Sequence, residues 1–590
     1  MNEENWREAI PDYADADYAI PYYDHGQAIH ADASQSNGID SDSSKSDLVA
    51  SHSVNEAHPP LPSTSWQPKR AVRSKLLYGI VGVLGALLVI FAGYAATLFL
   101  YTKLSPTSNS LKPPAPATFH YAPCPFKPGI GIVEGQELRC GFLTVPEDRS
   151  QPGSPGIQLA VAIFKAPQPD PSHTPEVYLN GGPGGALLND LGTYITPLNL
   201  ADLTLGHDLI LLDQRGTGFS RPLLTCPEFT DFETVAIRQN LTQDQARQLH
   251  LRAAQTCHDR LTNAGVNLQA YTTIANATDV HDLIHTLGYK QVNLYGVSYG
   301  TRLALTMMRL FPADIRSVVL DSTVPTQIDL FSSEPAVTQH ALDVLFEGCA
   351  ISQNCSSTYP QLQSLFYQLV NDLNARPVTF QDDQAGPVWI NGRALVSWLF
   401  QALYVTNLIP LLPEVITQIS RGNYELISQY YGLIMNESST GNGVSQSDGM
   451  YFSIECGEDM AFTTMQQLDN AVNVLRPEIR SGILNNLQND FAICKIWGQH
   501  PVPTAQKQPV TSSIPTLILS GEYDPITPSS NAKLAIQTLS NSFFFLFPAT
   551  GHGVLYTANC PDSITTAFLA HPGERPTGSC ITKMQEPNFQ

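Results

Sequence analysis

Gly296-Val297-Ser298-Tyr299-Gly300 is the stretch that decides the fold, because it joins a predicted buried strand to a predicted helix. Residues 291–295 are apolar and favour a strand, and residues 301–310 have helical periodicity. A Gly-x-Ser-x-Gly at such a junction is typical of a tight turn that lifts the serine hydroxyl above the edge of a sheet. The glycines are needed because a Cβ on either side of the serine would not fit. Ser298 is therefore the candidate nucleophile.

A serine hydroxyl needs a base to take its proton, and the base needs an acid to orient it. On a sheet of this kind the three groups follow one another along the chain as Ser, Asp or Glu, and His. Asp524 follows the predicted strand 516–520, and His552 follows the predicted strand 542–547. Both residues come in the required order at the carboxyl end of a strand. We therefore expect Asp524 to be the acid and His552 the base.

The oxyanion of an acyl-transfer intermediate needs backbone N–H donors. One donor is expected to be the amide of Tyr299, directly after the nucleophile. The turn at residues 180–185, Asn-Gly-Gly-Pro-Gly-Gly, follows the predicted strand 176–179, and its glycines permit close approach of the backbone to a ligand. We expect the second donor in this turn. Asp213 and Arg215, at the end of the next strand, are expected to brace the site by hydrogen bonds.

Strands alternate with helices in two parts of the chain, which predicts an α/β fold with a mainly parallel sheet. The two parts are residues 119–325 and residues 510–590. Residues 326–509 contain successive helical stretches with little strand pattern, so we interpret them as a mostly helical cap inserted into the sheet domain. The predicted strands are residues 138–145, 157–164, 176–179, 208–212, 291–295, 315–320, 516–520 and 542–547.

The chain before the sheet domain contains three segments of different composition. Residues 1–75 are acidic and lack an apolar period, which predicts a disordered tail with a basic end next to the membrane. Residues 76–102 contain no charged residue, which predicts a transmembrane helix of about 40 Å, enough to cross a hydrocarbon core of about 30 Å. Residues 103–118 are a Pro- and Ser-rich linker. Because basic residues cluster before the span, the tail is expected in the cytosol and the catalytic domain outside the cell or in the periplasm.

All ten cysteines lie after the predicted span. An even number confined to the exported part indicates a disulfide framework. No pair has the Cys-x-x-Cys spacing of a zinc site, so neither a metal nor a cofactor is expected. The sequence does not fix connectivity, but local spacing favours sequential pairing: Cys124 with Cys140, Cys226 with Cys257, Cys349 with Cys355, Cys456 with Cys494, and Cys560 with Cys580.

Charge excludes one class of partner. The formal net charge is −21 and the isoelectric point is near 5.0. Nucleic-acid binding requires a clustered basic face, so no nucleic-acid partner is expected.

Five blocks of sequence together resemble the motifs of proline iminopeptidases and, more closely, the secreted tripeptidyl aminopeptidases of the α/β-hydrolase superfamily. The resemblance covers about residues 124–580, and the transmembrane span and acidic tail depart from the secreted pattern. The blocks are residues 181–185, 213–218, 296–300, 521–524 and 551–553.

The resemblance implies an α/β-hydrolase fold and a role for each site residue. Ser298 is the nucleophile, Asp524 the acid and His552 the base, with Gly182 and Tyr299 as the oxyanion donors. It also implies a serine exopeptidase that acts on peptides with a free N-terminus, through an acyl-enzyme and without a cofactor.

An aminopeptidase must hold the substrate ammonium, and in related iminopeptidases carboxylates of the cap do so. Glu458 and Asp459, next to Cys456, are the candidates in this sequence. Two other functions stay open. The triad does not select amides over esters, so an esterase or other acyl hydrolase is the first alternative. The second is a non-catalytic binding ectodomain, which would usually lose the serine or the histidine. The sequence fixes neither the number of residues released, nor a preference for proline, nor the oligomeric state.

Overall fold

The computed structural model describes residues 116–590, except residues 171, 173, 383–385, 436–445, 556, 558 and 590. The predicted tail, the predicted transmembrane helix and nearly all of the predicted linker lie outside the described residues. Among the helices of the described part, none is long and apolar enough to cross a membrane.

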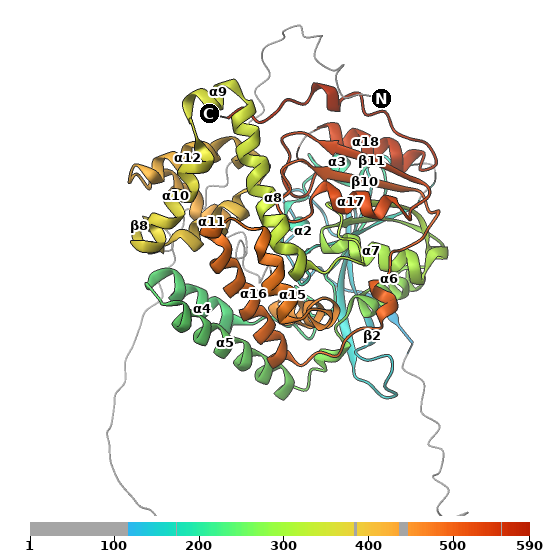
Figure 1. The fold of residues 1–590 in the computed structure, drawn as a ribbon. Helices are drawn as coiled ribbons and strands as arrows, with labels where there is room; N and C mark the ends of the chain where they lie inside the picture. The colour runs from blue at the N-terminus through green and yellow to red at the C-terminus, as the bar shows by residue number, and fades with distance from the viewer. Residues whose placement is uncertain are drawn as a thin grey trace, which may run out of the picture. The chain divides into compact units, whose positions relative to one another are not determined.

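A nine-stranded sheet forms the base of the domain, in the order β1-β2-β3-β5-β4-β6-β7-β10-β11 (Figure 1). The six strands from β5 to β11 in this order are parallel, and β1, β2 and β3 pair antiparallel at the other edge. The carboxyl ends of the parallel strands therefore meet along one edge of the sheet. The strands are β1 (Thr118–Tyr121), β2 (Leu138–Pro146), β3 (Gly156–Phe164), β4 (Glu176–Leu179), β5 (Leu209–Leu212), β6 (Val292–Val297), β7 (Ile315–Asp321), β10 (Thr516–Gly521) and β11 (Ser542–Phe547).

Helices cover both faces of the sheet, because alternate residues of each central strand point to opposite sides. On β6, Leu294 packs in one apolar cluster with α6 (Thr273–Thr286) and α7 (Tyr299–Leu310). The next residue, Tyr295, packs in a different cluster with α18 (Asn559–Ala570). The strand is thus buried on both sides, as its nearly continuous apolar sequence predicts.

The segment between β7 and β10 is mostly helical and has its own apolar core, in which Phe366 and Leu399 are fully buried. Figure 1 shows these helices gathered beside the sheet. The main elements are α8 (Leu330–Ile351), α9 (Gln353–Thr358), α10 (Leu362–Ala375), the hairpin β8 (Val378–Asp382) and β9 (Gly386–Ile390), α11 (Gly392–Ala402), α12 (Leu412–Ser420), α13 (Glu425–Met435), α14 (Asp448–Glu458), α15 (Met465–Ala471) and α16 (Pro477–Trp497).

Two further helices join this helical layer from another part of the chain. Helices α4 (Pro227–Arg238) and α5 (Gln243–Asn263) come between β5 and β6, yet α5 lies beside α16, and α4 packs on α5 (Figure 1). Their residues share an apolar cluster with Trp497 of α16 and Met450 of α14. The helical layer above the sheet is therefore built from two separate insertions.

All eight predicted strands are confirmed, with ends within two residues of those expected. The structure adds β1 and the hairpin β8–β9, which the sequence analysis did not predict. Three of the four residues of β1 are exposed, so its sequence lacks the alternation of a half-buried strand.

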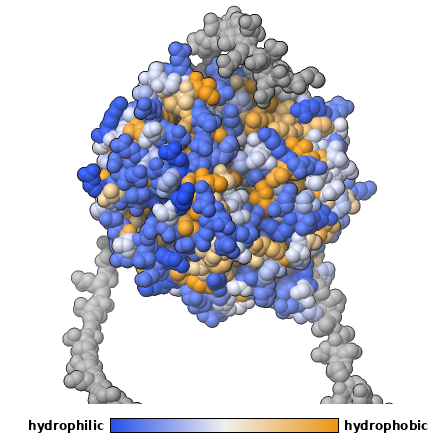
Figure 2. Space-filling view, viewed as in Figure 1, coloured by the Kyte–Doolittle hydropathy of each residue, from blue (hydrophilic) through white to orange (hydrophobic). Residues whose placement is uncertain are grey.

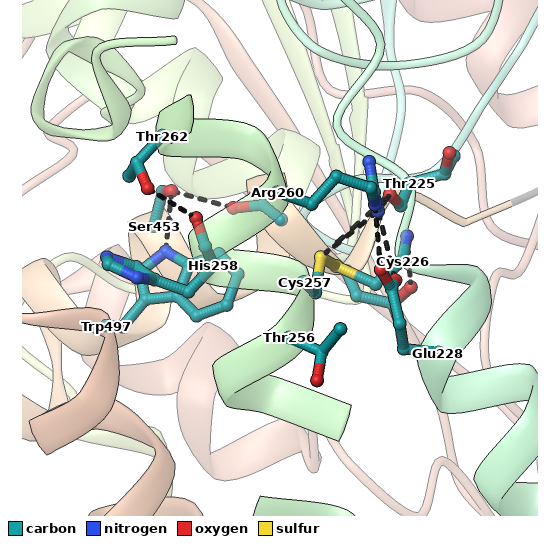
Figure 3. Close-up of a disulfide and its surroundings, with 12 residues drawn as sticks. Thr225, Cys226, Glu228, Thr256, Cys257, His258, Arg260, Thr262, Ser453 and Trp497 are labelled. Atoms are coloured by element: carbon teal, nitrogen blue, oxygen red, sulfur yellow. Dashed lines mark hydrogen bonds and ion pairs between the residues drawn. A yellow bond between two sulfur atoms is a disulfide. The ribbon is translucent and has the colours of Figure 1, made fainter. Parts of the chain in front are cut away.

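The predicted sequential disulfide pairing is confirmed for all five bridges. One of them, Cys226–Cys257, joins α4 to α5 (Figure 3). On the face shown in Figure 2, hydrophobic residues lie in small groups between hydrophilic ones rather than in one broad patch.

Candidate active site

Ser298 lies at the turn between β6 and α7, where the backbone is strained. Its φ of 56° and ψ of −125° fall in a region that non-glycine residues rarely adopt. A Cβ on Gly300 would lie 1.8 Å from the carbonyl oxygen of Leu179, and one on Gly296 would lie 2.5 Å from the carbonyl oxygen of Gly300. Only glycine fits at either position, and the turn has the geometry of the predicted nucleophile elbow.

Asp524 and His552 meet at the same edge of the sheet. They follow β10 and β11, which are adjacent and parallel, so their carboxyl ends lie side by side. His552 Nδ1 lies 2.9 Å from Oδ2 and 3.0 Å from Oδ1 of Asp524. The Asp524 side chain is fully buried, and that of His552 is 10 % exposed. Because Nδ1 faces the carboxylate, Nε2 is the ring nitrogen left to exchange a proton with other groups.

The carboxylate of Asp524 is held by the residues that follow it. The amides of Ile526 and Thr527 donate to Oδ1 at 3.0 and 2.8 Å, and the Thr527 hydroxyl donates to Oδ2 at 2.6 Å. Burial alone would raise the pKa of Asp524, but His552 and the hydrogen bonds from Thr527 outweigh it and lower that pKa below its ordinary value. Asp524 is therefore a fixed negative charge behind the imidazole.

His552 is also positioned through Tyr404. Its amide donates to the carbonyl of Tyr404 at 3.2 Å, and the two ring centroids are 4.8 Å apart. Burial would lower the pKa of His552, but the carboxylate of Asp524 outweighs it and raises that pKa above its ordinary value. Within the described residues, Ser298 Oγ makes no hydrogen bond with His552. Asp524 and His552 are therefore hydrogen-bonded in this structure, whereas His552 and Ser298 are not.

The end of β7 ties the serine turn to the histidine loop. The amide of Ser298 donates to the carbonyl of Asp321 at 3.0 Å. The carboxylate of Asp321 accepts from the amide of Val554 at 2.8 Å, and the Ser322 hydroxyl accepts from the amide of Gly553 at 2.9 Å. Two consecutive residues thus anchor both the nucleophile and the residues directly after His552.

The glycine turn after β4 passes beside the nucleophile. A Cβ on Gly181 would lie 3.1 Å from the Cβ of Ser298. Gly182 has φ +111°, a backbone conformation open to glycine. Neither the amide of Gly182 nor that of Tyr299 donates a hydrogen bond within the described part of the chain. Both predicted oxyanion donors are therefore unpaired in this structure.

Asp213 and Arg215 brace loops around the site, as expected. Asp213 Oδ1 accepts from the amides of Leu187 and Leu188 at 2.8 and 3.0 Å. Arg215 Nε donates to Asp279 Oδ2 at 2.7 Å in a buried ion pair. Their side chains are occupied in these contacts, which fits a supporting role.

Glu458 is part of a buried chain of hydrogen bonds that ends at Tyr299. Thr273 donates to both carboxylate oxygens of Glu458, from its amide at 2.6 Å and from its hydroxyl at 2.7 Å. The Tyr299 hydroxyl lies 3.0 Å from Thr273 Oγ1 and must donate to it, because the threonine proton points to Glu458. Asn276 Nδ2 donates to the Tyr299 hydroxyl at 3.2 Å. Glu458 thereby holds the side chain of the residue that carries a predicted oxyanion amide.

Asp459 is fully buried between two cations. Its Oδ2 lies 2.6 Å from Arg302 Nη1, and its Oδ1 contacts the ammonium of Lys507. The role of Glu458 and Asp459 in binding a substrate ammonium stays a prediction. The structure gives each carboxylate a protein donor already, which favours a structural role for both.

A cavity of about 540 Å³ in the helical layer lies next to the acid–base pair. Ile526, two residues after Asp524, lines it, as does Phe400, whose ring centroid is 5.9 Å from that of Tyr404. Glu334 of α8 also lines it and has no hydrogen bond or ion pair within the described residues. Burial and the neighbouring Asp490 raise the pKa of Glu334 to about 8.

Three residues that the sequence analysis did not name shape this site: Asp321, Glu334 and Thr527. Asp321 ends an apolar strand, the same signal that identified Asp524. Thr527 follows Asp524 at the spacing of a side-chain-stabilised turn, which was visible in Asp-Pro-Ile-Thr. Glu334 lies within a helix and has no local signal.

Two groups of metal-ligating side chains occur among the described residues, both away from the triad. Cys226 and Cys257 of the first group are joined in a disulfide. In the second, His281 Nδ1 and His285 Nε2 lie 2.6 and 3.1 Å from the carboxylate of Asp314, which precedes β7. This position is at the opposite edge of the sheet from the triad.

Comparison with known proteins assigns the family. The model of the α/β hydrolase fold matches residues 177–558, which include Ser298, Asp524 and His552. The chain is 31% identical over 461 residues to the tripeptidyl aminopeptidase of Streptomyces coelicolor, covering 74% of this chain and 81% of that protein. It is 24% identical over 468 residues to the serine protease Hip1 of Mycobacterium tuberculosis (75% and 86% covered). It is 24% identical over 463 residues to the carboxylesterase B of the same species (74% and 85% covered). The chain belongs to the α/β-hydrolase family and is a serine hydrolase related to the tripeptidyl aminopeptidases.

Proposed function

We propose that this protein is a serine aminopeptidase that removes residues or short peptides from peptide N-termini through an acyl-enzyme. The observation that carries the proposal is the meeting of three elements at one sheet edge: the strained turn at Ser298 and the buried pair of Asp524 and His552. The relation to the tripeptidyl aminopeptidase of Streptomyces coelicolor supports a peptide substrate.

In the proposed first step, Ser298 Oγ attacks the carbonyl carbon of the scissile bond and His552 Nε2 takes its proton. This step requires the Ser298 side chain to rotate into hydrogen-bond range of the imidazole, a contact that often tightens only with substrate bound. The amides of Gly182 and Tyr299 donate to the oxyanion, and Asp524 stabilises the imidazolium. Hydrogen bonds aimed at the developing charge are worth about 10²–10³ in rate for each donor.

To complete the acyl-enzyme, His552 gives its proton to the leaving amine, and the C–N bond breaks. Water then enters, gives a proton to His552 and attacks the acyl-enzyme. The collapse of this second intermediate returns the proton to Ser298 Oγ and releases the N-terminal fragment.

The proposal assigns the substrate ammonium to Glu334 rather than to Glu458 or Asp459. Glu334 lines the cavity and lacks a partner within the described residues. It also lies near Tyr404, whose pKa it raises together with burial and Asp524, and Tyr404 contacts the ring of His552. A substrate ammonium would supply the missing positive charge and favour the ionised form of Glu334.

We also propose that residues 76–102 anchor the enzyme in a membrane, with the catalytic domain outside the cytosol. The uncharged length of this segment and the basic residues before it support the orientation. The five disulfides support an oxidising compartment.

The catalytic proposal is tested with pairs of peptide anilides that differ only in an acetyl group on the N-terminus. We expect the free-amine substrates to be cleaved and the acetylated ones to be cleaved at least about tenfold more slowly, because the acetyl group removes the charge that Glu334 binds. Ser298→Ala should abolish turnover and Glu334→Gln should reduce the preference for the free amine. Equal cleavage of both substrates would refute exopeptidase action, and Ser298→Ala activity within tenfold of the unmodified enzyme would remove Ser298 as nucleophile.

The second candidate function is an esterase, favoured by the similarity to the carboxylesterase B of Mycobacterium tuberculosis. Short acyl esters and free-amine anilides compared on one preparation separate the two functions. An esterase would hydrolyse the esters and leave every anilide intact.

A further inference from the structure

Arg393 lies in the wall of the cavity that Ile526 and Phe400 also line. It is the only Arg or Lys among the described residues that line this cavity. Its guanidinium makes no hydrogen bond or ion pair within the described part of the chain, and burial lowers its pKa. The residue as a whole is solvent-exposed at the cavity wall, and a guanidinium there that has no carboxylate partner can bind an anionic ligand, because carboxylates match its donors in pairs.

Helix α11 carries Arg393 and also Phe400, the lining residue that contacts Tyr404 next to His552. Arg393, Val396, Ser397, Phe400 and Gln401 of this helix line the cavity, which is the spacing of one helical face. Phe400 is at the end near Tyr404 and the triad, and Arg393 lies seven residues earlier. At 1.5 Å per residue the two are about 10 Å apart along the axis, the length of about three extended peptide residues.

The stem of Arg393 is held on the facing helix. A Cβ on Gly482 of α16 would lie 3.5 to 3.8 Å from three carbons of the Arg393 side chain, so the stem packs over this glycine. These distances are those of ordinary van der Waals contact, so the stem lies against α16 at the cavity wall.

The other titratable groups around the cavity do not neutralise Arg393. Glu478 of α16 is paired with Arg476 at 3.4 Å. His250 of α5 is close enough for Arg393 to lower its pKa, which burial and that charge bring to about 4, so it is neutral near pH 7. Glu334 lines the part of the cavity assigned above to the substrate ammonium. Among the described residues that line the cavity, Glu334 is the carboxylate and Arg393 the guanidinium that form no ion pair.

We infer that Arg393 is a specificity-determining residue that selects peptides with an acidic side chain in the released N-terminal portion. The inference rests on the proposed aminopeptidase function and adds the substrate class to it. The ammonium of such a peptide meets Glu334, and its side-chain carboxylate meets Arg393. The cavity volume of about 540 Å³ is within the range of ligand sites for molecules larger than a single residue.

The test is a set of tripeptidyl anilides in which each position in turn carries Glu or the isosteric Gln. For at least one position we expect kcat/KM to be about tenfold or more higher with Glu, the size of a charge-assisted hydrogen bond. Arg393→Gln should bring that ratio close to one, and Arg393→Glu should invert the preference in favour of Lys. Arg421→Gln, at an exposed arginine outside the cavity, is the matched control and should keep the ratio.

Cleavage of these peptides with no preference for Glu, or with a preference that survives Arg393→Gln, would overturn the inference and leave the aminopeptidase proposal standing. Failure of the enzyme to cleave any free-amine anilide would overturn the aminopeptidase proposal itself. If an Arg393 variant does not fold, a Glu-against-Lys comparison on the unmodified enzyme still tests the acidic preference, and a lack of that preference would overturn the inference.

Discussion

The hydroxyl of Thr527 donates a hydrogen bond to the oxygen of Asp524 that the neighbouring backbone amides leave free. It donates to Oδ2 at 2.6 Å, while the two backbone amides both donate to Oδ1. Thr527→Val keeps the shape of the side chain and removes this donor from a buried carboxylate. We predict a fall in kcat of about tenfold, from a loss of about 1.5–3 kcal/mol that is shared between folding and the transition state. Thr527→Ser keeps the hydroxyl and should retain most of the activity. An equal fall in kcat in the Thr527→Val and Thr527→Ser variants would show that packing, rather than the hydrogen bond, causes the loss.

The Asp524–His552 pair predicts the direction in which the pH profile responds to mutation. The imidazole must be neutral to act as base, and Asp524 raises its pKa, so kcat/KM should rise with pH through a value above 6.5. Asp524→Asn removes the carboxylate and leaves burial, which lowers the pKa of His552. We predict that the acidic limb moves to lower pH, while the plateau falls by about 10³–10⁴ because the ring loses its orienting partner. A pH series of kcat/KM for both enzymes measures this. If the acidic limb of the profile does not move, a group other than His552 determines its position.

The positions of the three candidate triad residues could be predicted because each follows a strand whose apolar run is visible in the sequence. Ser298 was identified by its flanking glycines at the junction of a predicted strand and a predicted helix, and Asp524 and His552 by their strand ends and their order along the chain. Glu334 could not be predicted, because a glutamate in a helix has the same pattern whether it faces water or a cavity. The hydrogen bonds from Thr273 to Glu458 depend on helix packing that no local pattern encodes, and the predicted role of Glu458 in binding the substrate ammonium stays a prediction.

At the level of elements, the helix pair α4–α5 shows how an insertion becomes part of the helical layer. Cys226–Cys257 joins the two helices, and Arg260 makes two contacts with Glu228, at 2.7 and 3.0 Å (Figure 3). On the other side, Trp497 Nε1 of α16 donates to the Ser453 hydroxyl of α14 at 3.0 Å. The ring centroids of His258 of α5 and Trp497 lie 5.5 Å apart, so the helix pair contacts α16 and, through Trp497, α14, the helix that ends at Glu458.

We predict that replacing both cysteines of this bridge by serine lowers the free energy of unfolding by about 2–4 kcal/mol, since the bridge closes a long segment of the unfolded chain. The sequence separation is 31 residues for Cys226–Cys257 and 6 residues for Cys349–Cys355. The second bridge is therefore the matched control, and its removal should cost about 1–2 kcal/mol less. Denaturant unfolding of both double variants measures the order. The reverse order would show that native packing, rather than loop length, decides the loss.

The strands of the sheet were predictable where both faces are buried and unpredictable where they are not. β6 and β7 have nearly continuous apolar sequences, whereas β1 is mostly exposed and β8–β9 is a hairpin inside a helical segment. The predicted cap, residues 326–509, does not include α4 and α5. Their place in the helical layer depends on contacts between segments far apart in the chain, which the sequence does not reveal. Periodicity identifies which face of an element is buried, but it does not identify the partner.

For the molecule as a whole, the C-terminal segment connects the sheet to the helical layer. Phe589 is buried in the apolar cluster of that layer, and its carbonyl accepts from Asn354 Nδ2 at 2.9 Å. Tyr523, one residue before Asp524, belongs to the same cluster. The residue next to the catalytic acid and the end of the chain thus pack together against the cap. This arrangement makes the position of Asp524 depend on the packing of both layers.

The membrane anchor is the prediction that concerns the full chain. If residues 76–102 form the predicted helix of about 40 Å, it is long enough to cross a core of about 30 Å, and apolar burial rather than ionic contact would hold it there. We therefore predict that the full-length protein stays in the membrane fraction after an alkaline carbonate wash, and that deletion of residues 76–102 releases it. The Ser298→Ala variant, which does not alter the span, should stay with the membrane.

The orientation of the chain is tested separately. Protease added to intact cells, or to spheroplasts if an outer membrane is present, should digest the catalytic domain and spare an epitope placed in residues 1–75, because the basic cluster before the span favours a cytosolic tail. Digestion of the epitope with protection of the domain would reverse the orientation, and release by the wash would remove the anchor while leaving the active-site chemistry as it stands.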